Sequence, residues 1–473
     1  MVIRSRRVVL PDIVRPASIH ISNGTITRVA DYDDVNEDAI DAGDLVISPG
    51  LVDTHVHVNE PGRTEWEGFD TATRAAAAGG VTTIVDMPLN SVPATTTVEA
   101  LETKRAAARG KCHVDIAFWG GVVPGNAGEL DALVGAGVRG FKCFLVPSGV
   151  DEFPHVDESD LRQALPVLAR RGVPLLVHAE SPAVLADVAR AFQARDRGPE
   201  RAALRYEEYE STRPPAAEVE AIRLMIHLAQ EFGARVHIVH VASAEATDEI
   251  ARAKADGVPI TAETCPHYLT FSAEEIPDGA TEFKCAPPIR DARHREALWG
   301  ALKSGVLDLV ATDHSPAPPS MKCRGDFMRA WGGVASLELS LAALWSARLK
   351  PSRYEGGDDV ARRLQPSDRN VDDGARRLQA SVGDITRWMS EAPARLAGVD
   401  DRKGRLAPGY DADVVVWDPD AEFTVDAARL QQRHKLTPYA ERRLRGVVHA
   451  TYLRGELVWD GDRLTTERAG RLL

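Results

Sequence analysis

The amino-acid sequence predicts an α/β fold: a (β/α)8 TIM barrel with a small β-sandwich domain that is formed from both chain ends. Two observations lead to this prediction. The middle of the chain alternates short apolar runs with helix-length stretches, which is typical of a parallel sheet covered by helices. Both ends contain short alternating segments separated by turn residues, which is typical of β-hairpins. We therefore expect residues 1–50 and 404–473 to build the β domain, and 51–403 to build the barrel.

The two chain ends resemble each other in pattern. Alternating segments occur at residues 8–10, 18–21 and 26–29, with the turn pair Asn23-Gly24 between the last two. The C-terminal end has the same alternating pattern at 413–417 and 446–453. Neither end has enough strands for a core of its own, so we expect one domain from both.

Eight apolar runs in the middle of the chain are candidate barrel strands. Eight is the number that closes a (β/α)8 barrel. Ala- and Leu-rich stretches at 161–171 and 218–232 are expected helices between them. A doubly wound open sheet is the alternative, but no Gly-x-Gly-x-x-Gly opens a helix. The expected strands cover residues 45–57, 81–87, 114–119, 140–145, 174–178, 235–241, 260–263 and 308–312.

One stretch, residues 351–380, does not follow this alternation of expected strands and helices. It is polar and contains a short internal duplication, so we expect a surface insertion.

Composition and charge narrow the class of protein. The 473 residues include 57 Lys+Arg and 70 Asp+Glu, which gives a net charge of −13. This acidic balance argues against a nucleic-acid partner. Five scattered cysteines form neither a disulfide framework nor a thiolate zinc site. The sequence contains no run of about 18 apolar residues, so it predicts no membrane span. We expect a cytoplasmic protein with no membrane partner.

The first barrel run ends in Asp53-Thr54-His55-Val56-His57. Side chains alternate along a strand, so His55 and His57 face one side and can share a divalent ion. Taken alone, a pair of hydrogen-bonded structural histidines explains the motif equally well.

Further candidate ligands recur at the ends of later strands. His178, His240 and Asp313 each close an apolar run, and strand ends converge at one mouth of a barrel. His237 is an odd number of residues from His240, so we expect it to pack outside the barrel. The convergence favours a metal site over isolated imidazoles, whose burial without partners is costly.

Lys142 lies inside an apolar strand, where an unpaired ammonium is expensive. Desolvation and positive neighbours lower the pKa of a lysine, and the neutral amine is a nucleophile that can react with carbon dioxide. The resulting N-carboxylate could bridge two metal ions. A lysine that reaches the barrel rim or pairs with an acid is the alternative.

Together these motifs resemble the amidohydrolase superfamily, and within it the cyclic amidohydrolases: dihydroorotase, dihydropyrimidinase/hydantoinase and allantoinase. The resemblance spans nearly the whole chain and includes residues 404–413 at the return into the β domain. It implies two divalent metal ions bridged by N6-carboxylated Lys142, with zinc the first expectation and cobalt, manganese or iron the alternatives. It also implies a homodimer or homotetramer. The implied ligands are His55, His57, Lys142 and Asp313 for one ion, and Lys142, His178 and His240 for the other.

Substrate-side positions separate the subfamilies. Dihydroorotases carry Arg two places after the His-x-His motif, where this chain has Asn59, and dihydropyrimidinases carry a Tyr shortly after the modified lysine, which is absent here. Segments 59–63, 87–91, 143–154 and 331–333 are instead similar to those of allantoinases. The resemblance therefore implies metal-dependent hydrolysis of the hydantoin ring of allantoin to allantoate, in purine catabolism, with Asp313 as general base and acid. A hydantoinase-type cyclic amide hydrolase and a non-catalytic scaffold on the same fold are the alternatives.

Among the site residues, those that contact substrate are the least well determined by the sequence. Allantoin is neutral and rich in amides, so its pocket needs donors and acceptors more than charges. We expect Asn90, Ser315 and Gly332 to contribute, although a turn-forming role explains each equally well. His267 and His314 are expected to support the site without touching substrate.

Overall fold

The computed structural model describes residues 1–36, 38–194, 204–348, 380–466 and 468–473. The insertion expected at 351–380 lies, apart from Ala380, outside the described residues.

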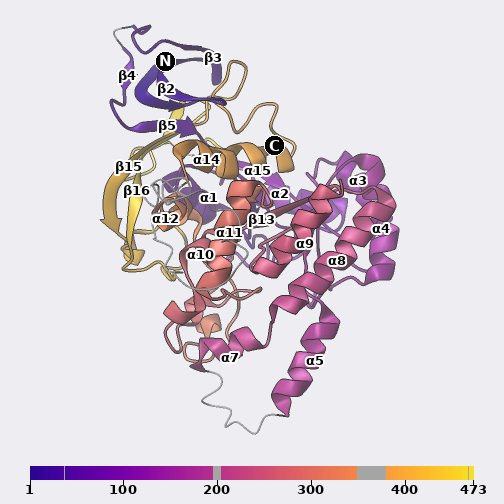
Figure 1. Ribbon diagram of the computed structural model, residues 1–473. Coiled ribbons are helices and arrows are strands. Elements are labelled where there is room, and N and C mark those ends of the chain that lie inside the picture. The colour runs from indigo at the N-terminus through magenta and orange to yellow at the C-terminus, as the bar shows by residue number, and fades with distance from the viewer. Residues whose placement is uncertain (37, 195–203, 349–379, 467) are drawn as a thin grey trace, which may run out of the picture.

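Strands from both chain ends form a single sheet, seen at the upper left of Figure 1. The junction is the antiparallel pairing of β5 with β15, in which Val414 lies opposite Pro49 and Trp417 opposite Val46. The structure thus confirms that the two ends build one β domain. In spatial order the strands are β17 (Glu456–Trp459), β16 (Arg443–Leu453), β15 (Val414–Thr424), β5 (Val46–Pro49), β1 (Val2–Val9), β2 (Val14–Ser22) and β3 (Thr25–Ala30), with β4 (Ile40–Asp41) on β1.

Parallel strands from the middle of the chain form the barrel. One barrel position holds two short strands, β8 and β9, on either side of Trp119, so the predicted eightfold alternation is confirmed. The ring closes where His57 N donates to His314 O at 2.9 Å and His314 N donates to His55 O at 3.2 Å. The strands are β6 (Leu51–Val56), β7 (Val81–Asp86), β8 (Asp115–Phe118), β9 (Gly120–Gly121), β10 (Phe141–Phe144), β11 (Leu175–His178), β12 (Val236–Ile238), β13 (Ile260–Thr264) and β14 (Leu309–Val310).

The expectation of one continuous strand over residues 45–57 is wrong. Its first half is β5 of the β domain and its second half is β6 of the barrel, with Gly50 between them. A Cβ atom at Gly50 would lie 2.2 Å from Thr82 Oγ1, so only glycine lets the chain cross this close to β7. The apolar run is continuous because both halves are buried.

Helices surround the barrel, as Figure 1 shows for α3, α4, α8, α9 and α11. Their starts carry local signals: Asp157 and Asp160 form a capping box at α4, and Ser243 caps α9. The helices are α1 (Phe69–Ala78), α2 (Val98–Ala108), α3 (Leu130–Gly135), α4 (Glu158–Arg171), α5 (Pro182–Gln193), α7 (Tyr206–Ser211), α8 (Pro215–Phe232), α9 (Ala244–Ala255), α10 (Pro266–Thr270), α11 (Ala292–Ser304), α12 (Ser340–Ala347), α14 (Val382–Thr386) and α15 (Ala392–Leu396). A π-helical turn spans Arg387–Glu391, and 3₁₀ turns span Ala273–Glu275, Thr281–Phe283, Pro319–Lys322, Leu337–Leu339 and Ala427–Arg429.

Two apolar layers hold the barrel together. Val85, Leu176, Val239 and Leu309 pack in one cluster, and the strand faces that meet the helices pack in a larger one. Burying each such side chain stabilises the fold by about 1.5–3 kcal/mol. None of the helices in the described ranges is both long and apolar enough to cross a membrane.

A buried ionic cluster joins the β domain to the start of barrel strand β8. Lys403 Nζ lies 2.6 Å from both Asp115 Oδ2 and Asp413 Oδ2, and Arg454 Nη1 lies 2.6 Å from Asp115 Oδ1. Asp115, Asp411 and Asp413 are close enough to hold a cation, and the Lys403 ammonium already fills that role.

Candidate functional site

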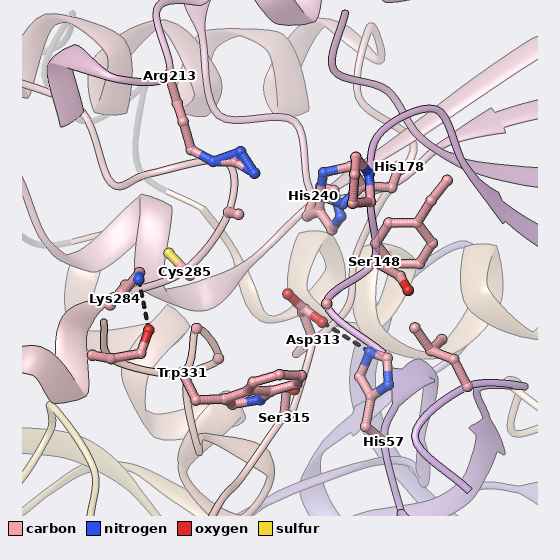
Figure 2. Close-up of a pocket in the computed structure, with 18 of the residues that line it drawn as sticks. His57, Ser148, His178, Arg213, His240, Lys284, Cys285, Asp313, Ser315 and Trp331 are labelled. Atoms are coloured by element: carbon pink, nitrogen blue, oxygen red, sulfur yellow. Dashed lines mark hydrogen bonds and ion pairs between the residues drawn. The ribbon is translucent and has the colours of Figure 1, made fainter. Parts of the chain in front are cut away.

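A cavity of about 480 Å³ opens at the mouth of the barrel, where the C-terminal ends of the strands meet. Figure 2 shows His57, His178, His240 and Asp313 on one side of this cavity, with Arg213, Lys284 and Cys285 across from them. All six residues expected as metal ligands line it: His55, His57, Lys142, His178, His240 and Asp313.

The first group of candidate ligands is compact. Asp313 Oδ1 lies 3.2 Å from His55 Nε2 and 3.4 Å from His57 Nε2, and ligand atoms of the three residues lie within 4.8 Å of one another. Burial would raise the pKa of Asp313, but His55, His57 and His240 outweigh it and hold that pKa well below its ordinary value. Burial lowers the pKa of His57 to about 4, so this imidazole is neutral and able to bind a cation.

The second group comes from β11 and the segment after β12. The His178 and His240 rings lie 4.6 Å apart, edge to face, and Phe144 stacks on His178 at 4.6 Å. Burial lowers the pKa of both histidines. His240 Nδ1 is buried and has no hydrogen-bond partner in the described structure.

Lys142, on β10, is fully buried between these groups, and its Nζ has no hydrogen-bond partner among the described residues. Burial lowers its pKa to about 8, against the attraction of Asp313 and Glu263. A fraction of the amine is therefore neutral near pH 7–8, as carboxylation requires. The two unpartnered nitrogens, Lys142 Nζ and His240 Nδ1, together with this nitrogen-and-oxygen donor set, fit a site for divalent metal ions.

The backbone is strained where it aims two of these side chains. His240 has φ 42° and Asp313 has φ 47°, in the left-handed region that non-glycine residues rarely adopt. The turn at His240 also breaks strand alternation. The expectation that His237 packs outside the barrel is wrong: its Nε2 lies 3.0 Å from the buried carboxylate of Glu263, which contacts His55.

Two buried glutamates behind the histidines were not predicted from the sequence. Glu263 Oε1 lies 2.5 Å from His55 Nδ1, and Glu180 Oε2 lies 2.7 Å from His178 Nε2. Arg213 Nη1 lies 3.3 Å from Glu180 Oε2. The available signal was position: Glu180 comes two residues after a candidate ligand, and Glu263 ends the seventh apolar run.

The expected substrate contacts all line the cavity. Asn90 Nδ2 lies 3.4 Å from His57 Nδ1, so this side chain also contacts a candidate ligand. Ser315 follows Asp313 on the segment after β14, and its N donates to Val334 O at 3.0 Å. Gly332 lies in the segment 328–333 on the far wall.

Two lysines, neither expected from the sequence, hold that far wall. Lys284 Nζ donates to Ala330 O at 2.6 Å, and Lys322 Nζ donates to Trp331 O at 3.2 Å. The Trp331 ring meets Trp66 edge to face at 5.0 Å. Burial lowers the pKa of each lysine to about 8. Because their ammonium groups are engaged with carbonyls, we assign them to shaping the cavity.

The two supporting histidines differ in their contacts. His314 Nδ1 accepts from Ser336 N at 3.2 Å and Leu337 N at 3.3 Å, which fixes the segment after β14. The His267 ring lies 4.2 Å from that of Tyr268 at a tilt of 58°, and neither of its nitrogens finds a hydrogen-bond partner in the part of the chain described. Neither residue lines the cavity.

A barrel with histidines, an aspartate and a buried lysine converging at its C-terminal mouth has the design of a metal-dependent hydrolase. The chain belongs to the amidohydrolase family, whose model matches residues 46–458. It is 49% identical to an allantoinase of Streptomyces avermitilis over 100% of this chain and 98% of that protein, and 40% identical to an allantoinase of Arabidopsis thaliana over 99% and 90%. Among solved structures, an L-hydantoinase (dihydropyrimidinase) from Arthrobacter aurescens is similar, with a TM-score of 0.87, 29% identity and coverage of 100% and 98%.

Proposed function

We propose that this protein is an enzyme that hydrolyses the cyclic amide of allantoin, giving allantoate. The observation that carries the proposal is the full-length similarity to proteins named allantoinase, at 49% identity for the Streptomyces relative. The site is compatible with that reaction, because the candidate ligands converge on one cavity of small-molecule size. Its substrate is therefore a small molecule, in the purine breakdown route to which allantoin belongs.

For the metal centre we propose His55, His57, Lys142 and Asp313 around one ion, and Lys142, His178 and His240 around the other. Lys142 would be N6-carboxylated, which turns an unpartnered buried amine into an anionic bridge. Zinc is our first choice of ion. When bound, the ions would activate a water molecule and polarise the ring carbonyl.

Asp313 moves the proton in this proposal. Neighbouring histidines hold the pKa of its carboxyl low, so the group is ionised and can accept a proton from the attacking water. It then delivers that proton to the ring nitrogen as the carbon–nitrogen bond breaks. A carboxylate at the centre of the ligand group, 3.2 Å from His55 and 3.4 Å from His57, is placed for both transfers.

Asn90, Ser315 and Gly332 are the proposed substrate contacts. All three line the cavity and none carries a charge, which suits a neutral, amide-rich ring.

The proposal also covers the oligomeric state, the cellular location and the domain boundaries. We infer a homodimer or homotetramer, as the family resemblance implies, and domains at 1–50, 51–403 and 404–473. A cytoplasmic location fits the five cysteines, all of which are unpaired in the structure.

The direct test is to incubate the purified, zinc-loaded protein with allantoin and to identify the product by mass and by carbon NMR. The expected product is allantoate, one water heavier than the substrate. Asp313→Asn should retain the fold and lose at least about 100-fold in kcat, because general acid–base groups contribute about 10²–10⁴. Unchanged allantoin after incubation with fully metallated protein would refute the proposal.

A second candidate is a dihydropyrimidinase or hydantoinase activity. The fold match to the Arthrobacter L-hydantoinase favours it, with a TM-score of 0.87. The lower identity of that match, 29%, makes it the weaker candidate.

A further inference from the structure

Two buried carboxylates lie behind the proposed metal centre, and their role depends on the dinuclear metal site proposed above. Glu180 is fully buried, and its Oε2 lies 2.7 Å from His178 Nε2. Glu263 is also fully buried, and its Oε1 lies 2.5 Å from His55 Nδ1. Each proposed metal position thus has one histidine in contact with one buried glutamate.

These contacts select which ring nitrogen is free. A neutral imidazole has one N–H, and a carboxylate can only accept it, so the proton resides on the nitrogen that faces the glutamate. For His178 the free lone pair is then on Nδ1. For His55 it is on Nε2, the atom that lies 3.2 Å from Asp313 Oδ1.

Each glutamate is itself fixed by a second partner. Arg213 Nη1 lies 3.3 Å from Glu180 Oε2, on the same oxygen that meets His178. His237 Nε2 lies 3.0 Å from Glu263 Oε2, and the other nitrogen of that ring lies 2.8 Å from Thr261 Oγ1. Arg213 lies at the cavity wall (Figure 2). The carboxylates therefore cannot swing away from their histidines without losing a second contact.

We propose that Glu180 and Glu263 are positioning residues, one for each metal position, that set the tautomer and orientation of His178 and His55. Arg213 and His237 hold them in place. Hydrogen-bond partners of ligating histidines typically contribute about 10- to 100-fold in metal affinity. Removing one glutamate should consequently weaken one metal position and leave the other.

The experiment measures metal binding without substrate, so its outcome is independent of which cyclic amide is hydrolysed. Metal-free wild type, Glu180→Ala, Glu180→Gln and Glu263→Ala are titrated with Co²⁺, followed by calorimetry and by visible absorption of the bound ion. We expect Glu180→Ala to lose about 10- to 100-fold in affinity for one of two ions. Glu180→Gln should lose less, because its amide oxygen can still accept the His178 N–H.

Glu263→Ala should lose affinity for one ion to a similar degree, and the double variant for both. Glu218→Gln is the matched control, because Glu218 is also buried and lies 2.6 Å from Arg290 without contacting a proposed ligand. It should bind both ions as wild type does, even where its thermal stability falls. Wild-type affinity for two ions in Glu180→Ala, equal weakening of both positions by one substitution, or the same loss in Glu218→Gln would overturn the proposal.

Discussion

Lys142 differs from the other buried lysines at the scale of single residues. Lys104, Lys322 and Lys403 each donate to carboxylate or carbonyl oxygens, whereas Lys142 Nζ contacts no acceptor in the described structure. Burying an ammonium without a partner is costly, so the fold itself favours a neutral or modified amine at this position. That contrast supports the proposed carboxylation.

Replacing this lysine gives a direct prediction. Lys142→Ala should lose both metal ions and reduce kcat by at least about 100-fold, because it removes the bridging ligand and the orientation of both ions. A short-chain carboxylic acid such as acetate or propionate should restore part of the activity by occupying the vacated volume. Metal analysis and initial rates, with and without the acid, measure both effects. A variant that keeps two metal ions and the full rate without additive would contradict carboxylation.

Candidate ligands were predictable from sequence because the histidines and Asp313 stand at the ends of apolar runs and Lys142 is a charged residue inside one. Their partners were not: nothing in the sequence shows that the Glu180 carboxylate turns back to His178 two residues earlier, and Glu263 meets His55 from a distant strand. His55 and Glu263 lie 208 residues apart, and no local pattern reports such a contact.

At the scale of elements, the ends of the barrel strands explain one wrong expectation. Strict alternation predicted that only one of His237 and His240 points inward. His237 faces inward from β12, where it contacts Glu263, and the left-handed backbone at His240, with φ 42°, interrupts the alternation so that this second ring faces the site as well. Such strain accumulates at functional sites, and sequence periodicity carries no sign of it.

The junction between the segment before α12 and the β domain gives a pH-dependent prediction. Burial raises the pKa of Glu338 from its ordinary 4.5 to about 7, although Gln431 N donates to its carboxylate at 2.5 Å. A raised acid pKa means that stability is fully present below the unfolded value and declines as pH rises through the folded value. The wild type should therefore lose stability between about pH 4.5 and 7 from this group.

Glu338→Gln removes the buried charge. The free energy of unfolding of this variant should equal that of the wild type near pH 4.5 and exceed it by roughly 1–3 kcal/mol at pH 8. Urea unfolding at both pH values measures this difference. The exposed Glu456→Gln should show no such pH-dependent difference. An equal offset at both pH values would contradict the assigned pKa.

At the scale of the whole molecule, counting apolar runs was enough to predict a barrel, because eight buried parallel strands leave eight continuous apolar segments. The β domain was predictable because neither end could bury a core alone. The crossing at Gly50 between β5 and β6 was not predictable, because the strands on both sides of it are buried and form one continuous apolar run in the sequence. It depends on contact with Thr82, which only the folded chain provides.

The link between the two domains is itself testable. Lys403 contacts Asp115, Asp411 and Asp413 at 2.6, 2.9 and 2.6 Å. Lys403→Met should therefore leave the buried Asp413 without its cation, while Asp115 and Asp411 keep only their arginine partners. Breaking a buried pair in this way costs about 3–5 kcal/mol. The melting temperature should fall by roughly 3–5 °C, because the unfolding entropy of a 473-residue chain is about 1 kcal/mol/K. The cluster lies at the start of β8, away from the cavity, so kcat at 20 °C should remain unchanged. An unaltered melting temperature would contradict this role.

The central claim is that this barrel acts on allantoin in preference to other cyclic amides. The most direct test is kcat/KM of the zinc-loaded enzyme for allantoin, hydantoin, dihydrouracil and dihydroorotate under identical conditions. We expect the value for allantoin to be the largest. A larger value for hydantoin or dihydrouracil would contradict the claim and assign the protein to the hydantoinase branch of its family.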